Sequence, residues 1–253
     1  MAITLADIKR GRDDRPPRLV VYSAPKVGKS TFAACAPDPI FLQTEEGLDA
    51  IDVARIDLLG ASLEDFMGGL QALATEEHEF KTVVLDSADW LEPIIWQACC
   101  DEAQVDSIEK VGGGYGKGYL EADRKWREVL QALDYLRNEK NMCCVIICHE
   151  QTVKVQPPDG EAYDVAGLKL HKRASALLHE WADIIGYARV RVALKAEDSG
   201  FGKTRKRAVQ VGDEHQLIVA NNPAYVTGNR YGITDTLPLD WQAFADALRE
   251  ARS

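Results

Sequence analysis

The sequence predicts an α/β fold, a mostly parallel sheet flanked by helices, with antiparallel strands added near the C-terminus. Apolar strand-like runs alternate with helix-like segments over about the first 150 residues, which implies right-handed crossovers between parallel strands. A loop with phosphate-binding character follows the first strand-like run, and the last third of the chain has the pattern of a strand meander. With 253 residues, 46% hydrophobic and 28% charged, the chain can form one large domain.

We expect residues 1–17 to form an N-terminal arm and residues 18–253 to form a single domain, with a core at 18–195 and strands and a helix at 196–253. Between His149 and about Lys172 the periodicity is lost, which predicts a long functional or mobile loop. The other elements follow from periodicity and capping signals: strands at 19–22, 40–42, 82–85 and 142–148; helices at 29–36, 62–75 (capping box Ser62 and Asp65), 90–104, about 120–138 and 171–181; strands at 184–194, 207–211 and 217–219; and a last helix capped by Asp240.

Composition and charge narrow the class of protein. The formal net charge of -10 argues against a protein that coats duplex DNA by bulk electrostatics, but it allows a local basic track. The six cysteines lack the paired spacing of a zinc site, so we expect reduced core cysteines. No apolar run is long enough to cross a bilayer and residues 1–17 lack the apolar centre of a signal peptide, so we expect no membrane association and a cytoplasmic location.

The loop after the first strand carries the clearest chemical signal. The pattern GxxxxGK[ST] lets backbone amides wrap phosphates where a helix begins, and here a strand precedes the loop and a helix follows it. The sequence therefore predicts ATP and Mg²⁺ as cofactors, with Lys29 reaching the β and γ phosphates and the Ser30 hydroxyl on the metal. Ser23 replaces the usual first glycine, and Lys26 is either an extra cation for phosphates or a solvated lysine. The loop comprises Ser23, Ala24, Pro25, Lys26, Val27, Gly28, Lys29, Ser30 and Thr31.

Acidic and imidazole side chains end three further strands at the edge of the sheet that faces the loop. Asp86 ends an apolar run, which indicates the Walker B acid and a second Mg²⁺ ligand; capping of the next helix is compatible with the same position. Ser87 follows it rather than a glutamate, so the base must come from elsewhere, and we favour Glu45 over Glu46. His149 could donate to the γ-phosphate and report its loss, with a structural hydrogen bond as the alternative.

Together these motifs resemble the RecA-like ATPases, whose catalytic glutamate also follows the second strand. The stretch at 41–49 is particularly similar to them. More narrowly, the loop at 22–30, the Cys148-His149 strand end and the stretches at 177–183 and 229–232 resemble a phage family of nucleotide-binding proteins that includes single-strand annealing ATPases. The resemblance implies a RecA-like P-loop NTPase core and annealing or recombination on single-stranded DNA. It also implies a homo-oligomer, either ring or filament, in the host cytoplasm if the chain is phage-encoded, with a single-strand binding protein as a further candidate partner.

In RecA-like proteins two DNA loops follow the Walker B region and the sensor strand, and residues 112–119 and 151–171 occupy those places. The first loop offers Tyr115, Lys117 and Tyr119 for base stacking and backbone contact, with a flexible glycine linker as the alternative. The second offers Lys169, Lys172 and Arg173, which begin a stretch to Arg207 with ten basic and four acidic residues. That surplus could track phosphates or form a solvated strand face.

Hydrolysis at a subunit interface would need a basic residue from a neighbour, and the candidates are Arg205, Lys206, Arg207 and Arg230. Arg230 could also pack beside the nucleotide of its own chain or pair with an acid. Two other functions stay open at this point. One is a small-molecule kinase, although no arginine-rich lid is visible in the sequence, and the other is a nucleotide-binding scaffold without turnover.

Overall fold

The central sheet has the strand order β10-β8-β7-β1-β5-β4-β2-β3. The computed structural model describes residues 11, 14–198 and 204–253, and between residues 192 and 213 it describes the backbone alone. Its parallel part contains β1 (Arg18–Ser23), β2 (Pro39–Gln43), β3 (Ala54–Asp57), β4 (Thr82–Asp86), β5 (Cys143–Val155) and the start of β7 (Ile184–Asp198). Antiparallel pairing adds β8 (Thr204–Ile218) and β10 (Thr236–Pro238) beyond β7. The predicted mostly parallel sheet with C-terminal antiparallel strands is confirmed.

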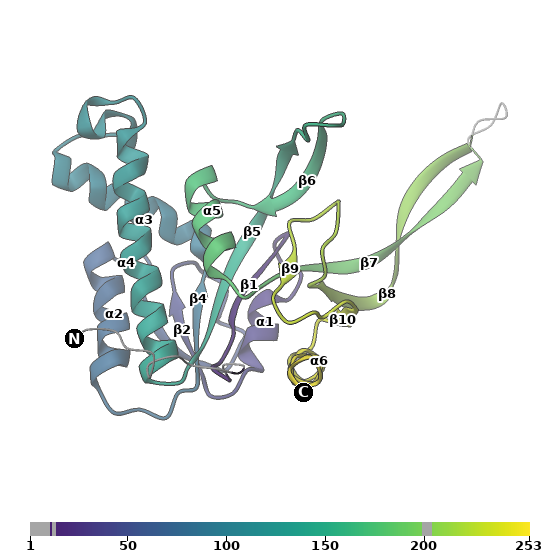
Figure 1. The fold of residues 1–253 in the computed structure, drawn as a ribbon, viewed down its shortest axis with the longest axis horizontal. Helices are drawn as coiled ribbons and strands as arrows, with labels where there is room; N and C mark the ends of the chain where they lie inside the picture. The colour runs from purple at the N-terminus through teal and green to yellow at the C-terminus, as the bar shows by residue number, and fades with distance from the viewer. Residues whose placement is uncertain (1–10, 12–13, 199–203) are drawn as a thin grey trace.

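Helices cover both faces of this sheet (Figure 1). One face carries α2 (Leu63–Thr75), α3 (Ala88–Ala103), α4 (Lys117–Glu139) and α5 (Lys172–Trp181), and the other carries α1 (Lys29–Ala34) and α6 (Trp241–Arg252). The predicted N-caps both form, because the Ser62 hydroxyl accepts from the Asp65 amide and the Asp240 carboxylate accepts from the Ala243 amide. Most of the predicted arm, residues 1–10, 12 and 13, lies outside the described residues.

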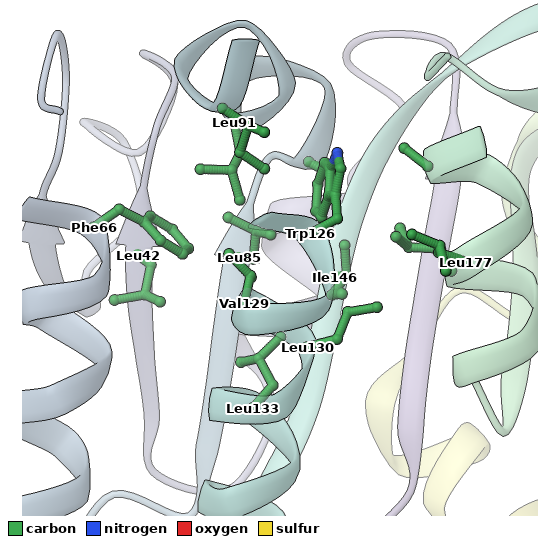
Figure 2. Packing of buried hydrophobic residues seen from close by; sticks show 14 of the residues in the cluster. Leu42, Phe66, Leu85, Leu91, Trp126, Val129, Leu130, Leu133, Ile146 and Leu177 are labelled. Carbon is green, nitrogen blue, oxygen red and sulfur yellow. The ribbon is translucent and has the colours of Figure 1, made fainter. Parts of the chain in front are cut away.

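The alternation of the strand residues explains the three layers. In β1, Val20 and Tyr22 pack in the cluster with α2 to α5, whereas Leu19 and Val21 pack in the cluster with α1 and α6. Figure 2 shows the first cluster, in which side chains of the central strands meet those of the covering helices. Both faces of the central strands are thus buried, and functional groups can emerge only at the strand ends.

The segments that lack hydrophobic periodicity in the sequence differ most from the predicted secondary structure. The segment after His149 is not a loop: β5 continues to Val155 and pairs with β6 (Tyr163–Leu168) as an antiparallel hairpin. Most of its residues beyond Cys148 are half-buried or exposed, and the hairpin projects away from the main sheet (Figure 1), so hydrophobic periodicity could not reveal it. The strands expected at 207–211 and 217–219 are one strand, β8, and the sequence analysis also missed β3, β10 and the short β9 (Gly228–Asn229).

The glycine-rich segment is shorter and more ordered than expected. A 3-10 turn, η2 (Ile108–Gly113), packs against the first turn of α4, which begins at Lys117 rather than near residue 120. A Cβ on Gly118 would lie 2.1 Å from the Ile108 carbonyl oxygen, so only glycine allows this close approach. Gly118 therefore has a packing role, which a flexible-linker interpretation does not provide.

Candidate nucleotide site

The loop between β1 and α1 has the geometry of a phosphate-binding loop. Gly28 is the N-cap of α1 with φ 105°, a conformation that favours glycine, and Lys26 also has a positive φ of 66°. Ser23 lies in the extended end of β1, so the position that usually carries glycine needs no positive φ here. The nine predicted loop residues are contiguous at this turn, with Lys26 and Thr31 exposed and Lys29 buried.

Lys29 is held along the loop by oxygen atoms. Its Nζ donates to Ser23 Oγ at 3.1 Å and to the Ala24 carbonyl at 3.2 Å. Burial lowers the pKa of Lys29, and the nearby carboxylates Glu45 and Asp86 oppose this shift. These weak neutral partners satisfy the ammonium group, and they are replaceable by the stronger acceptors of a phosphate group.

Ser30 and Asp86 form the oxygen pair that suits Mg²⁺. Ser30 Oγ donates to Asp86 Oδ2 at 2.7 Å, while the buried Asp86 Oδ1 has no hydrogen-bond partner among the described residues. Burial raises the pKa of Asp86, with Ser30 and Lys29 lowering it in opposition. No group of three or more metal-ligating acidic, His or Cys side chains occurs in the described part of the chain. The pair fits Mg²⁺, which binds through one or two protein oxygens together with substrate phosphates.

Glu45 is positioned by two hydrogen bonds that join the segments just beyond β2 and β4. The Thr44 hydroxyl accepts from the Ser87 amide at 2.8 Å and donates to the Ser87 carbonyl at 2.9 Å. The Glu45 side chain is 17% exposed, whereas Glu46 points into solvent. Burial raises the pKa of Glu45 to about 7, against the lowering effect of His149. A carboxylate with this pKa, beside the phosphate loop, suits a general base, and the geometry favours Glu45 over Glu46.

His149 enters the site because β5 lies between β1 and β4 in the sheet. Its Nδ1 lies 3.8 Å from Glu45 Oε2 and 3.0 Å from Asp89 Oδ2. Asp89 is not among the predicted site residues, although an acid in the first turn of the helix after Asp86 is a signal in the sequence. Burial alone would raise the pKa of Asp89, but hydrogen bonds from the His149 ring and amide outweigh it and lower this pKa.

The two predicted DNA segments meet beside this edge of the sheet. The Tyr119 ring stacks on the His171 ring, with centroids 4.1 Å apart and planes 7° from parallel. Tyr115 is 99% exposed, and Lys117 and Lys172 are also exposed. Three of the six predicted contacts are engaged within the chain: Tyr119 donates to Glu109, Lys169 pairs with Asp89 at 3.4 Å, and Arg173 pairs with Asp123 at 2.8 Å.

Arg230 is not brought to the phosphate loop. It lies at the opposite edge of the sheet, where its guanidinium pairs with Asp183 at 3.2 Å and donates to the Glu180 carbonyl at 2.6 Å. Asp183 immediately precedes β7 and also binds Arg18 at the start of β1. The predicted contact between Arg230 and the nucleotide of its own chain is therefore wrong. The ion pair with Asp183 holds the Arg230 side chain at the amino ends of the strands. The side chains of Arg205, Lys206, Arg207, Lys195 and Lys203, which belong to the other candidate cations and the predicted basic track, lie outside the described residues.

The loop leads into α1 with Lys29 and Ser30 at its end and Asp86 beside Ser30, and this arrangement defines a nucleotide-binding P-loop NTPase with an α/β core. The family model described as AAA domain matches residues 15–231, and the chain belongs to this family, whose domain is that of an ATPase. No curated protein matches the sequence. Among the helices of the described residues, none combines the length and the apolar character needed to cross a membrane.

Proposed function

We propose that this protein is a Mg²⁺-dependent, RecA-like ATPase that binds single-stranded DNA and promotes annealing in phage recombination. Lys29 and the loop amides bind the phosphates. Ser30 and Asp86 would hold a magnesium ion, which would supply positive charge beside the phosphates. Glu45 orients and deprotonates the attacking water, and its half-buried position, near enough to Lys29 to affect the pKa of that residue, supports this role. His149 contacts the γ-phosphate and responds to its loss.

The observation that carries the coupling to DNA is a continuous set of bonds from His149 to the DNA segments. The His149 carbonyl accepts from the Lys169 amide at 2.9 Å, and Asp89 binds both the His149 ring and the Lys169 ammonium. Two residues further along, His171 stacks on Tyr119 of the other segment. A shift of His149 on phosphate release would therefore move the backbone that presents both segments.

The chemistry of this surface fits single strands better than duplex DNA. Exposed Tyr115 offers a ring for base stacking, and exposed Lys117 and Lys172 offer cations for the phosphate backbone. The overall charge of -10 disfavours a protein that coats duplex DNA. Annealing, the phage context, oligomerisation with a cation supplied by a neighbour, and a single-strand binding protein as partner are carried by the resemblance to annealing ATPases.

Replacing the base separates an ATPase from a scaffold that binds nucleotide without turnover. We expect Glu45→Gln to keep ATP affinity and to lose at least about 100-fold in turnover, as loss of a general base typically costs. Glu46→Gln is the matched control, because Glu46 is exposed at the same turn, and it should hydrolyse ATP at the wild-type rate. Wild-type protein without measurable turnover under any DNA condition would favour the scaffold.

The DNA surface is tested by reversing one charge on it. Lys172→Glu should weaken binding to a labelled oligonucleotide about tenfold and reduce its stimulation of ATP turnover, because one phosphate contact becomes repulsive. Lys81→Glu makes the same change on an exposed lysine at the amino edge of the sheet and should bind DNA normally. Equal effects of the two variants would contradict this surface. Turnover stimulated by a metabolite but not by single-stranded DNA would indicate the kinase, and annealing is followed with complementary labelled strands.

A further inference from the structure

A histidine distant in the sequence is bonded to the phosphate loop. His215 of β8 lies with its Nδ1 2.7 Å from the Val27 carbonyl oxygen, although 188 positions separate the two residues. A carbonyl oxygen can only accept, so Nδ1 carries the hydrogen and donates it. No loop motif in the sequence identifies this contact, because it depends entirely on where β8 lies in the sheet.

The bond acts at the position that decides the loop's conformation. When the amides of a phosphate loop face the ligand, carbonyl groups on the outer side need other donors, and His215 supplies one for Val27. Gly28, the next residue, has φ 105°, and a Cβ there would lie 3.7 Å from the Leu239 side chain and 4.0 Å from His215 Nδ1. The His215 ring and the Leu239 side chain therefore lie next to the Gly28 backbone and limit its movement on that side.

The backbone of His215 is fixed on its other side as well. Its carbonyl accepts from the Leu239 amide at 2.9 Å, and β10 pairs with β8 through Leu237 and Leu217. The ring is thus attached to the sheet rather than to a free loop. A donor on a rigid element can hold the phosphate loop in one conformation before nucleotide arrives, which lowers the ordering cost of binding.

An irregularity in the β7–β8 hairpin begins next to this residue. Val190 pairs with His215, but the next pair joins Val192 to Gln210, so β7 has one residue, Arg191, where β8 has residues 211–214. Such bulges bend a strand and redirect the neighbouring side chains. The bulge separates the part of β8 that belongs to the main sheet from the long arm that projects away from it (Figure 1).

We propose that His215 is a positioning residue for nucleotide binding: it holds the Val27 carbonyl and keeps the phosphate loop in its binding conformation. The proposal rests on nucleotide binding by the loop and does not depend on DNA or on annealing. Because the same residue begins the bulge of the hairpin arm, the arm and the nucleotide site share this contact. His215 acts through the loop backbone and has no part in the chemical step.

The test compares a variant that keeps the ring with one that keeps the donor. His215→Phe removes the donor and retains an aromatic ring, whereas the amide nitrogen of His215→Asn lies where Nδ1 lies and restores the donor. We expect His215→Phe to raise the Kd of a fluorescent ATP analogue about tenfold, equivalent to about 1.4 kcal/mol, because the Val27 carbonyl loses its donor and the loop is no longer held in one conformation. His215→Asn should stay within about twofold of wild type, and kcat at saturating ATP should be retained in both.

A matched control separates loop positioning from general stability. His78 makes a bond of the same kind, from its Nε2 to the Leu73 carbonyl at 2.8 Å, on the far side of the sheet from the phosphate loop. His78→Phe should lower the unfolding midpoint without changing nucleotide affinity. Should His215→Phe not fold, His215→Ala takes its place in the comparison with Asn.

Hydrogen exchange gives a readout without ligand. The amides of Ala24 and of residues 26–30 should exchange faster in His215→Phe than in wild type or His215→Asn, because the loop samples other conformations. Wild-type affinity in the Phe variant, or equal loss in Phe and Asn, overturns the proposal. An unchanged exchange rate in the phosphate loop also overturns the proposal, because it would mean that His215 contributes to overall stability without holding the loop.

Discussion

Glu92 lies beside His171, and its burial makes the stability of the protein depend on pH in a direction that can be calculated. Its side chain is buried in α3, and both carboxylate oxygens accept from the His171 amide, at 2.9 and 3.1 Å. Burial raises the pKa of Glu92 from 4.5 to about 7, and the hydrogen bond from His171 opposes the shift. The folded protein therefore keeps the proton to a higher pH than the unfolded chain does.

Proton linkage determines whether the free energy of unfolding rises or falls with pH. Between pH 4.5 and about 7 the folded state holds one more proton at Glu92 than the unfolded state, so the free energy of unfolding falls as pH rises through this interval. Raising the pKa of Glu92 from 4.5 to about 7 corresponds to roughly 3–4 kcal/mol, because one pKa unit is worth about 1.4 kcal/mol. The contribution is complete below pH 4.5 and lost above about 7.

Glu92→Gln isolates this contribution, because the amide keeps an acceptor for His171 and cannot ionise. Urea unfolding of both proteins at pH 5, 6, 7 and 8 gives the difference in the free energy of unfolding at each pH, and other titrating groups cancel. We expect wild type to lose about 2–3 kcal/mol relative to the variant across this range. Parallel curves, or wild type gaining stability with pH, would refute the reasoning.

Three further predictions concern the site and the core. Asp89→Asn removes the charge that orients the His149 ring, and a hydrogen bond to a charged group contributes about 1.5–3 kcal/mol. We therefore expect kcat for ATP to fall about tenfold at unchanged KM, and a change confined to KM would contradict this. Gly28→Ala forces a side chain into a positive φ, so nucleotide affinity by calorimetry should fall about tenfold, whereas Gly68→Ala in open space on α2 should bind normally. Phe244→Ala should lower the free energy of unfolding by about 3–5 kcal/mol in urea, because the ring is 1% exposed in the core between α6 and the sheet; a loss under about 1 kcal/mol would contradict that packing.

Local patterns were reliable where a chemical requirement and a buried periodicity coincide. The phosphate loop, Asp86 and the caps at Ser62 and Asp240 depend on residues adjacent in the chain, and the structure has each in the expected element. The β5–β6 hairpin was not recognised, because most of its residues beyond Cys148 are half-buried or exposed and only Val165, Gly167 and Leu168 of β6 face the interior. The arm of β7 and β8 also did not appear as continuous strands.

Contacts between distant strands could not be predicted from the sequence. Arg230 carries the same charge as any phosphate-binding arginine, and only the pairing of β9 with β7 shows that it lies beside Asp183. Asp89 and His149 are 60 positions apart, and they meet because the strands β4 and β5 are neighbours. Each of these assignments depends on strand order, which local periodicity does not encode.

The sequence by itself determined the class of fold and the nucleotide chemistry, because a strand, a loop ending in Gly28-Lys29-Ser30 and a helix fulfil the whole requirement for phosphate binding within a few consecutive residues. Only the tertiary structure decided the contacts around that loop. His215 of β8 donates to the Val27 carbonyl and Asp89 binds the His149 ring, and long-range pairing in the sheet sets both distances. A residue's own neighbours in the chain carry no record of that pairing.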